Sequence, residues 1–182
     1  LLNLINQLLD LQKLSAGKLR AQYIQGDIIQ YIQYVFESFQ SLAMLKGQQL
    51  HFLSSDSSYF MDYDPDKLLH IISNLLSNAI KFTPPEGHVS LSVAMTDRGV
   101  EITVQDDGIG ISKSDIERVR QPFVQAESAM SRQSEGTGLG LTLVDAMMQE
   151  HGGYLELQSE DGKGTRATIV FPPDRLVRDG LA

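Results

Sequence analysis

Two periodicities of hydrophobic and polar residues run along this chain, and they separate expected helices from expected strands. The longest helical signal covers residues 65–82. Its apolar residues recur at the spacing of one broad helix face: Leu68, Leu69, Ile72, Leu75, Leu76, Ala79 and Ile80. Asp64 can cap this helix, Pro65 suits its first position, and Pro84 with Pro85 stops it. The pattern therefore predicts a helix with one buried face.

The remaining pattern predicts several shorter elements. Helices are expected at 1–22, 27–46, 112–120 and 139–150, and strands at 49–53, 59–63, 88–95, 100–105, 154–159 and 166–171. Residues 96–99 carry hairpin-turn chemistry, and Ser112 with Asp115 resembles a weak capping box. Residues 125–136 are polar and aperiodic, which predicts a loop long enough to be functional. The tail from Pro172 onward is expected to fray.

The first stretch has the spacing of a helix that packs on a partner helix. Leu1, Leu4, Leu8 and Leu11 form a seam at coiled-coil spacing. A plain core-packing helix is the alternative, because the seam decays at Ser15. The chain opens inside this periodic run and without an initiator Met, so we expect it to be part of a longer protein.

A polar stripe lies on the other side of the 65–82 helix. His70, Asn74, Asn78 and Lys81 share this face. Asn is a mediocre helix former, so two in register need an explanation. One interpretation is a solvated helix face. The other is a ligand face, in which an amide oxygen binds Mg²⁺ and the lysine binds phosphate, because Mg²⁺ takes oxygen ligands and shares them with nucleotide phosphates.

The composition narrows the function classes. With 182 residues, 42% of them hydrophobic and 21% charged, the chain resembles a folded globular domain. The given residues show no signal-peptide pattern, so none is expected within them, and they contain no apolar run of about 20 residues that could span a membrane. The net charge of -8 argues against a nucleic-acid groove and against an anionic membrane surface. Because the chain has no cysteine, disulfides, thiolate nucleophiles and cysteine-based zinc sites are excluded.

Two glycine-rich stretches carry the remaining chemistry. Asp106 ends an expected strand and is followed by Gly108 and Gly110, so its carboxylate could accept from an exocyclic amine while the backbone approaches a flat ring. A turn with solvated acids is the alternative, and the spacing is not that of an EF-hand. Residues 136–141 lead into a helix N-terminus, where free amides favour phosphate. Their spacing is neither that of a Rossmann loop nor that of a Walker A loop.

These motifs, in this order, resemble the catalytic ATP-binding domain of bacterial sensor histidine kinases, within the GHKL (Bergerat) superfamily. The matching residues are those of the N, G1, F and G2 boxes: Asn74, Asn78 and Lys81; Asp106, Gly108 and Gly110; Gln121, Pro122 and Phe123; and Gly136, Gly138, Leu139 and Gly140. His151-Gly152-Gly153 and Gly162-x-Gly164-Thr165 also match. The resemblance covers nearly the whole chain.

The resemblance implies ATP and Mg²⁺ as cofactors. It implies that Asn78 ligates Mg²⁺ with Asn74 in support, that Lys81 contacts phosphate, and that Asp106 binds the adenine amine with help from Thr165 through water. The other implied nucleotide contacts are Phe82, Gly108, Gly110, Ile111, Phe123, Arg132, Gly136, Thr137, Gly138, Leu139, Gly140 and Leu141.

An ATP lid is implied over about residues 125–138, hinged near Phe123, with Arg132 reaching the γ-phosphate. Arg120 stands where the F box of the family usually carries a Phe. We therefore expect the anchor of the lid to pack differently in this chain.

For the fold, the resemblance implies a two-layer α/β sandwich, with a mixed β-sheet covered on one face by helices and one long N-terminal helix before it. The order of expected strands and helices agrees with such a domain. Three regions are implied: 1–22 as the end of the second helix of a dimerisation and phosphoacceptor hairpin, 23–175 as the catalytic domain, and 176–182 as a tail.

The implied function is that of a protein-histidine kinase fragment in two-component signal transduction. It would bind Mg-ATP and present the γ-phosphate to a histidine, from which a response-regulator aspartate is then phosphorylated. The implied partners are ATP or ADP, a response-regulator receiver domain and a second copy in a full-length homodimer, with no nucleic acid. The domain would be cytoplasmic, and any inner-membrane anchor would lie in regions outside this chain.

One element of that family is absent from the chain, namely a phosphoacceptor His followed by an acid. We interpret His51, His70, His88 and His151 as satisfied or solvated histidines, and expect nucleotide binding without self-phosphorylation. Two alternatives stay open. An ATPase resembling gyrase, Hsp90 or MutL would need a glutamate where this chain has Asn74, and a pseudokinase scaffold would use nucleotide only as a ligand.

Overall fold

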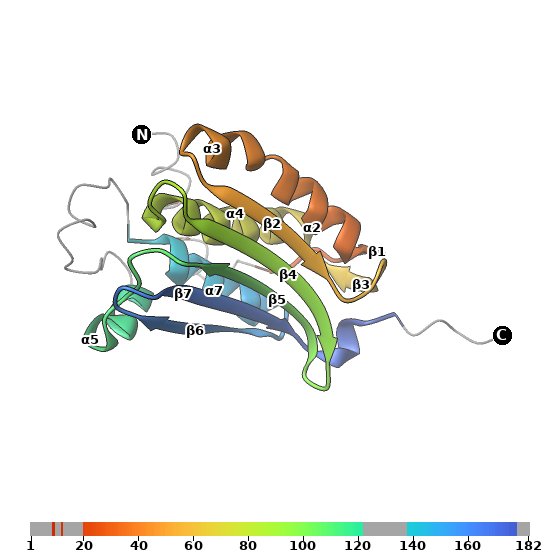
Figure 1. Ribbon diagram of the computed structural model, residues 1–182. Coiled ribbons are helices and arrows are strands. Elements are labelled where there is room, and N and C mark those ends of the chain that lie inside the picture. The colour runs from red at the N-terminus through yellow and green to blue at the C-terminus, as the bar shows by residue number, and fades with distance from the viewer. Residues whose placement is uncertain (1–8, 10–11, 13–19, 122–137, 178–182) are drawn as a thin grey trace.

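A computed structural model gives the fold of residues 20–121 and 138–177, with Leu9 and Gln12 as two further described positions. Figure 1 shows the elements along the chain. In chain order they are β1 (Ile24–Asp27), α2 (Ile28–Glu37), α3 (Gln40–Leu45), β2 (Gln49–Ser54), β3 (Phe60–Tyr63), α4 (Pro65–Phe82), β4 (His88–Thr96), β5 (Gly99–Asp106), α5 (Lys113–Ile116), the 3₁₀ turn η1 (Arg118–Arg120), α7 (Gly140–Glu150), β6 (Tyr154–Glu160), β7 (Gly164–Phe171) and the 3₁₀ turn η2 (Pro173–Arg175).

The main sheet is mixed and has five strands in the order β2-β4-β5-β7-β6. β2 runs parallel to β4, whereas β4–β5, β5–β7 and β6–β7 pair antiparallel. A separate antiparallel pair joins β1 to β3. The C-terminal end of β5 therefore lies beside the start of β7, because the two strands pair antiparallel.

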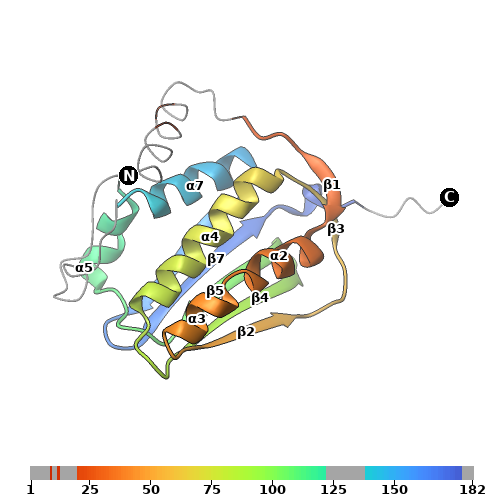
Figure 2. The same ribbon diagram turned by 90° about the horizontal axis from the view of Figure 1, so that it is seen from above.

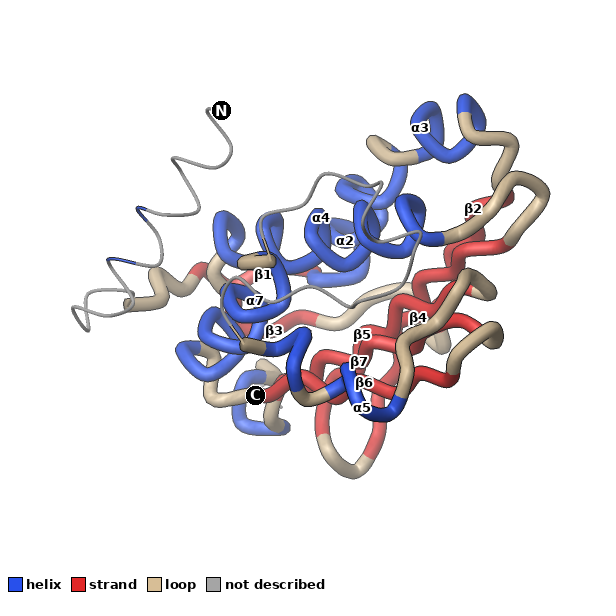
Figure 3. Tube along the Cα trace, turned by 90° about the vertical axis from the view of Figure 1, so that its left-hand side faces the viewer, coloured by secondary structure: helices blue, strands red, loops and turns tan. Residues whose placement is uncertain are grey.

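The helices α2, α4 and α7 cover one face of this sheet, as Figures 2 and 3 show from above and from the side. On β4, Val89, Leu91 and Val93 are buried whereas Ser90 and Ser92 are only half-buried, which is the alternation expected of a sheet covered on one face. The predicted fold class, a two-layer sandwich with a mixed sheet, is confirmed.

Helix α4 has the boundaries that the sequence predicts. The Asp64 side chain accepts hydrogen bonds from the backbone N–H groups of Asp66 and Lys67, both at 3.0 Å, and Pro65 occupies the first turn. At the other end Thr83 is extended and its N–H reaches back to Ala79. Seven apolar side chains of the helix are buried: Leu68, Ile71, Ile72, Leu75, Leu76, Ala79 and Ile80.

Three local predictions were wrong. The single helix predicted over 27–46 is two helices, because the hydroxyl and N–H of Ser38 both bond back to the carbonyl of Val35 and end α2. Strand β1 was not predicted at all. The helix predicted over 112–120 is α5 followed by η1, and the Ser112 hydroxyl bonds to the Asp115 carboxylate instead of capping the backbone.

The C-terminal segment was also wrongly predicted to fray from Pro172. The N–H of Val177 bonds to the carbonyl of Phe60 at 3.0 Å, and Leu176 bridges to Met61. Arg175 lies 4.1 Å above the ring of Tyr23 and donates to the carbonyl of His151. These long-range contacts hold the segment against the domain.

The predicted N-terminal helix falls mostly outside the described residues. Leu9 and Gln12 are helical, but residues 20–23 are not, so the helix ends before the predicted residue 22. Across the described parts of the chain, every helix is too short or too polar to cross a bilayer.

Candidate functional site

Asp106 is the buried acid of the candidate site. It ends β5 and is only 8% exposed. Its Oδ1 accepts hydrogen bonds from the N–H of Gly108 at 2.9 Å and from the N–H of Thr165, on β7, at 3.2 Å. Burial raises the pKa of Asp106 to about 6, opposed by these two hydrogen bonds and reinforced by the nearby Asp107. The carboxylate is thus held in place by two segments that are far apart in sequence.

Glycines line the backbone around this acid because no side chain would fit. A Cβ at Gly108 would collide with the carbonyl oxygen of Phe82, and one at Gly164 would collide with that of Asp106. Gly110 has a φ of +70° and packs against the carbonyl of Glu160. The N–H of Ile109 also bonds to the Phe82 carbonyl at 3.2 Å. The loop after β5 is therefore joined directly to the C-terminal end of α4.

The polar stripe of α4 meets the start of α7. A Cβ at Gly140 would lie 2.9 Å from Oδ1 of Asn74 and 4.0 Å from Nδ2 of Asn78. Asn74 donates to the carbonyl of His70 at 2.9 Å, and both asparagines are half-buried. Glycine at position 140 therefore lets the first turn of α7 approach the two amides closely.

The phosphate-binding candidates lie at the same end of α4 and α7. Lys81 lies 5.0 Å from the ring centre of Phe82. Gly138 has a φ of +68° before α7 begins. Leu139 is fully buried, so only its backbone is available to a ligand, whereas Leu141 is half-buried and packs against the core. A helix N-terminus beside an ammonium and two amides is suited to binding phosphate.

The structure brings most of the predicted nucleotide contacts to one end of the sandwich. These are Asn74, Asn78, Lys81, Phe82, Asp106, Gly108, Gly110, Ile111, Gly138, Leu139, Gly140, Leu141 and Thr165. Phe123, Arg132, Gly136 and Thr137, and with them most of the predicted ATP lid, lie outside the described residues.

Two residues at this end were not singled out from the sequence. Asp107 accepts from the N–H of His88 at 2.7 Å and so ties the loop after β5 to the start of β4. The Ser159 hydroxyl contacts Ile111, Gly164 and Thr165 at once. The one sequence feature that could have pointed to Asp107 is its place as the second acid in Asp106-Asp107-Gly108. Nothing in the sequence pattern marks Ser159.

His151 is fully buried and accepts from the N–H of Asp64 through Nε2 at 3.0 Å. Its Nδ1 lies 2.8 Å from the Met147 carbonyl, so the proton is on Nδ1 and the ring is neutral. Burial lowers its pKa, which agrees with this state. The prediction of a satisfied histidine is confirmed for this residue.

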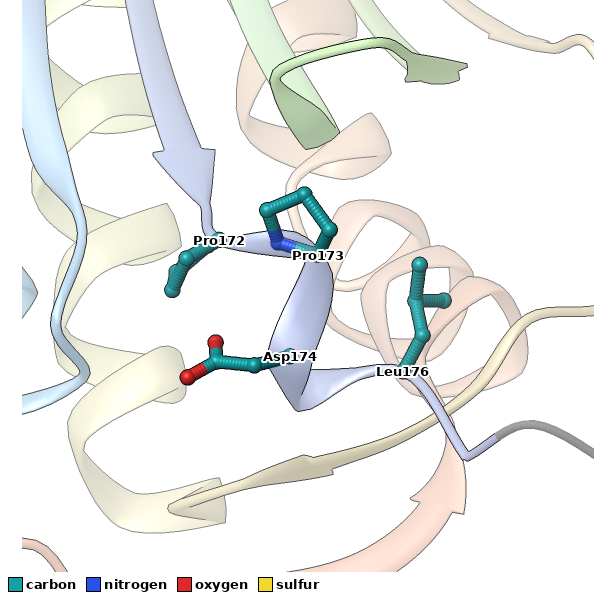
Figure 4. A pocket seen from close by; sticks show the side chains of 4 residues that line it. All are labelled: Pro172, Pro173, Asp174 and Leu176. Atoms are coloured by element: carbon teal, nitrogen blue, oxygen red, sulfur yellow. The ribbon is translucent and has the colours of Figure 1, made fainter.

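A shallow hollow lies at the far end of β7, away from the site. Pro172, Pro173, Asp174 and Leu176 line it, as Figure 4 shows. Thr165 stands at the start of β7 and these residues follow its end, so the hollow is separated from Asp106 by the length of the strand.

Comparison with known proteins identifies the domain. Residues 63–175 match the family model described as histidine kinase-, DNA gyrase B-, and HSP90-like ATPase. The chain is 34% identical over 178 residues to sensor histidine kinase WalK of Bacillus subtilis and 38% identical over 172 residues to histidine protein kinase DivJ of Caulobacter vibrioides. Each alignment covers 94% of this chain but only 28% and 29% of the respective relative, so the chain spans under a third of their length.

Solved structures agree. Full-length ShkA in complex with AMPPNP superposes with a TM-score of 0.82 at 28% identity, covering 94% of this chain and 35% of that one. The catalytic domain of histidine kinase ThkA superposes with a TM-score of 0.73 at 20% identity, covering 84% of this chain and 98% of that domain, which supports the fold. The chain therefore belongs to the histidine kinase-, DNA gyrase B- and HSP90-like ATPase family and carries the catalytic ATP-binding domain of the sensor histidine kinase type.

Proposed function

We propose that this domain binds Mg-ATP and presents its γ-phosphate to a histidine on a dimerisation helix of the same protein. The observation that carries the proposal is the Asp106 carboxylate. It is buried, fixed by two backbone N–H groups on Oδ1, and set beside glycines that let neighbouring backbone segments approach one another closely. An adenine amine is a donor of the kind such a carboxylate accepts.

The phosphate end would be formed by Lys81, the first turn of α7 and the amide of Asn78. Mg²⁺ commonly takes one or two protein oxygens and fills its remaining positions with water and phosphate oxygens. The described residues contain no group of three or more acids or histidines that could hold a metal, and a single amide oxygen beside a phosphate site fits that habit. Bound Mg²⁺ would neutralise phosphate charge, while Asn78 and Lys81 orient the triphosphate.

Transfer to a histidine is favoured over hydrolysis. Activation of water needs a basic carboxylate on the ATP helix. At the corresponding position Asn74 carries an amide, which has no basic lone pair to take a proton, and this amide donates to the His70 carbonyl. In the complete protein we propose that the phosphoryl group then passes from the histidine to an aspartate of a response-regulator receiver domain, within a homodimer.

Calorimetric titration of the chain with AMPPNP, with and without Mg²⁺, tests the proposal. We expect Mg²⁺-dependent binding. Asp106→Asn and Asn78→Ala should each weaken it by about 10- to 100-fold, which is the range for a hydrogen bond to a charged group. The matched controls are Asp97→Asn, in the exposed β4–β5 turn, and Gln33→Ala, on the exposed face of α2.

Both controls should bind like the unchanged chain. Absence of binding by the unchanged chain would overturn the proposal and favour a scaffold that acts by binding partners. Binding that is equally tight in Asp106→Asn would show that the base is held elsewhere.

A further inference from the structure

Ser159, at the end of β6, joins the two loops that surround Asp106. Its hydroxyl oxygen accepts from the N–H of Ile111 at 2.7 Å, which fixes the loop after β5. The same hydroxyl lies 2.8 Å from the carbonyl of Gly164 and 2.8 Å from the hydroxyl of Thr165, at the start of β7. Three hydrogen-bond partners thus meet at one oxygen.

Counting protons fixes the direction of each of these bonds. A serine hydroxyl has one proton and two lone pairs. The Gly164 carbonyl can only accept, so the Ser159 proton is used there. The N–H of Ile111 takes one lone pair. The remaining lone pair can only accept, and the bond between Ser159 and Thr165 therefore carries the proton of Thr165.

Thr165 is left as an acceptor toward any ligand. Its hydroxyl proton is committed to Ser159 and its backbone N–H is committed to Oδ1 of Asp106, at 3.2 Å. Among the described residues, both hydrogen bonds to the Asp106 carboxylate fall on Oδ1, so Oδ2 is the oxygen left for a ligand. The Thr165 hydroxyl and the Asp106 carboxylate, on neighbouring strands, then offer only lone pairs.

A pair of acceptors discriminates between purines. The 6-amino group of adenine donates hydrogen bonds, whereas the 6-oxo group of hypoxanthine or guanine accepts them. Placing an oxo group against acceptors leaves polar groups unpaired, and a site built to pair with a donor rejects such an analogue strongly.

We propose that Ser159 is a positioning residue that sets the preference of the site for a 6-amino over a 6-oxo purine. It does so by holding the Thr165 hydroxyl in the orientation of a hydrogen-bond acceptor. The inference rests on the proposed nucleotide function. Ser159 itself touches no base; it acts through Thr165. Removal of the Ser159 hydroxyl frees the Thr165 proton, and Thr165 can then donate to a 6-oxo group.

The test compares ATP with inosine triphosphate, which carries a 6-oxo group where ATP carries the 6-amino group. Their dissociation constants are measured by calorimetry in Mg²⁺ for the unchanged chain and for Ser159→Ala. We expect the ratio of the two constants to shrink by about fivefold in Ser159→Ala, the worth of one hydrogen bond. Ser54→Ala is the matched control, because it also removes a serine hydroxyl bonded to a backbone carbonyl, at 2.6 Å, but at the end of β2.

Thr165→Val separates positioning from general loosening of the loops. If Ser159 acts through Thr165, the double variant Ser159→Ala with Thr165→Val should have the same ratio as Thr165→Val alone. Ser159→Thr, which keeps the hydroxyl, should restore the ratio of the unchanged chain. A merely structural role would weaken both nucleotides equally and leave the ratio unchanged, which would overturn the inference.

Failure of the proposed function gives a different result. In that case the unchanged chain would bind neither nucleotide. Tight binding of ATP by the unchanged chain, with an unaltered ratio in Ser159→Ala, would contradict only the role of Ser159.

Discussion

Asp64 and Asp106 are both buried aspartates, 3% and 8% exposed, and they lie at opposite ends of helix α4. Asp64 uses both oxygens. Oδ1 accepts from the N–H groups of Asp66 and Lys67, and Oδ2 accepts from the N–H of Gln22 at 2.7 Å and from Nζ of Lys67 at 2.9 Å. The two hydrogen bonds to Asp106 both fall on one oxygen, and neither comes from a cation.

The pKa values of the two groups move in opposite directions. Burial alone would raise the pKa of Asp64, but the N–H groups of Gln22 and Lys67 and the Lys67 ammonium outweigh it and bring the pKa below its usual value. At Asp106 burial prevails and the pKa rises to about 6. A buried carboxylate stabilises the fold when both of its oxygens accept hydrogen bonds. A buried carboxylate with one oxygen left for a ligand destabilises the fold but suits a binding site.

Replacing Asp64 should have the largest effect on stability. Asp64→Ala removes the cap of α4 and the buried acceptor of the N–H of Gln22 and of the Lys67 ammonium, so we expect the free energy of unfolding to fall by about 3 kcal/mol. Urea denaturation at neutral pH measures this. Asp66→Ala, in the exposed first turn of the same helix, is the control and should cost about 0.5 kcal/mol. Equal losses of unfolding free energy in the two variants would contradict the claim that the hydrogen bonds to both oxygens of Asp64 stabilise the fold.

Replacing Asp106 should change the free energy of unfolding in the opposite direction. A pKa raised to about 6 in the folded state, from 3.8, means that ionisation disfavours the fold. The stability linked to the protonated acid is complete below the unfolded value and is lost as the pH rises through about 6. Asp106→Asn keeps an acceptor at Oδ1 without the charge, so it should raise the free energy of unfolding by on the order of 2 kcal/mol at about pH 8.

The gain should vanish at about pH 3, below the unfolded pKa of 3.8, where the acid is mostly protonated in both states. Urea denaturation at the two pH values checks both statements. A loss of stability in Asp106→Asn at the higher pH would show that the charge of this acid is compensated after all.

Replacing Lys67 should have the smallest effect. Lys67→Met removes the ammonium that bonds to Oδ2 of Asp64 and to the carbonyl of Arg20, and should cost about 1 kcal/mol. The Lys67 ammonium helps to lower the pKa of Asp64, and the stability linked to this lowered pKa is lost as the pH falls through the folded value. Without the ammonium the pKa of Asp64 rises, so acid unfolding of this variant should move to higher pH. Lys163→Met, which breaks an exposed ion pair with Glu160, is the control. It should change neither the free energy of unfolding nor the pH of acid unfolding.

The sequence predicted the parts that depend on local pattern. Helix α4 with Asp64, Pro65 and its apolar face, and the alternating strands β4 and β5, were found where the periodicity placed them. The described parts of the predicted nucleotide motifs also lie at one end of the sandwich, since Asp106 ends β5 and Gly140, which begins α7, approaches Asn74 and Asn78 of α4.

The parts that depend on long-range contacts could not be predicted. Strand β1 is short and lacks alternation, and it exists because it pairs with β3. The segment after Pro172 is held by Phe60, Met61 and Tyr23, all more than a hundred residues earlier in the chain. Ser159 has no local signature, since its role depends on three partners that only the folded sheet brings to it.

The most direct test of the account is an NMR titration of the aspartate side-chain carboxyl carbons, with and without saturating Mg-ATP. Without nucleotide, Asp106 should titrate at about 6 and Asp64 below its usual range. If the adenine amine donates to the ionised acid, as we propose, ATP should lower the pKa of Asp106 and leave that of Asp64 unchanged. An Asp106 titration that is unaltered by bound ATP would contradict the claim that this carboxylate recognises the base.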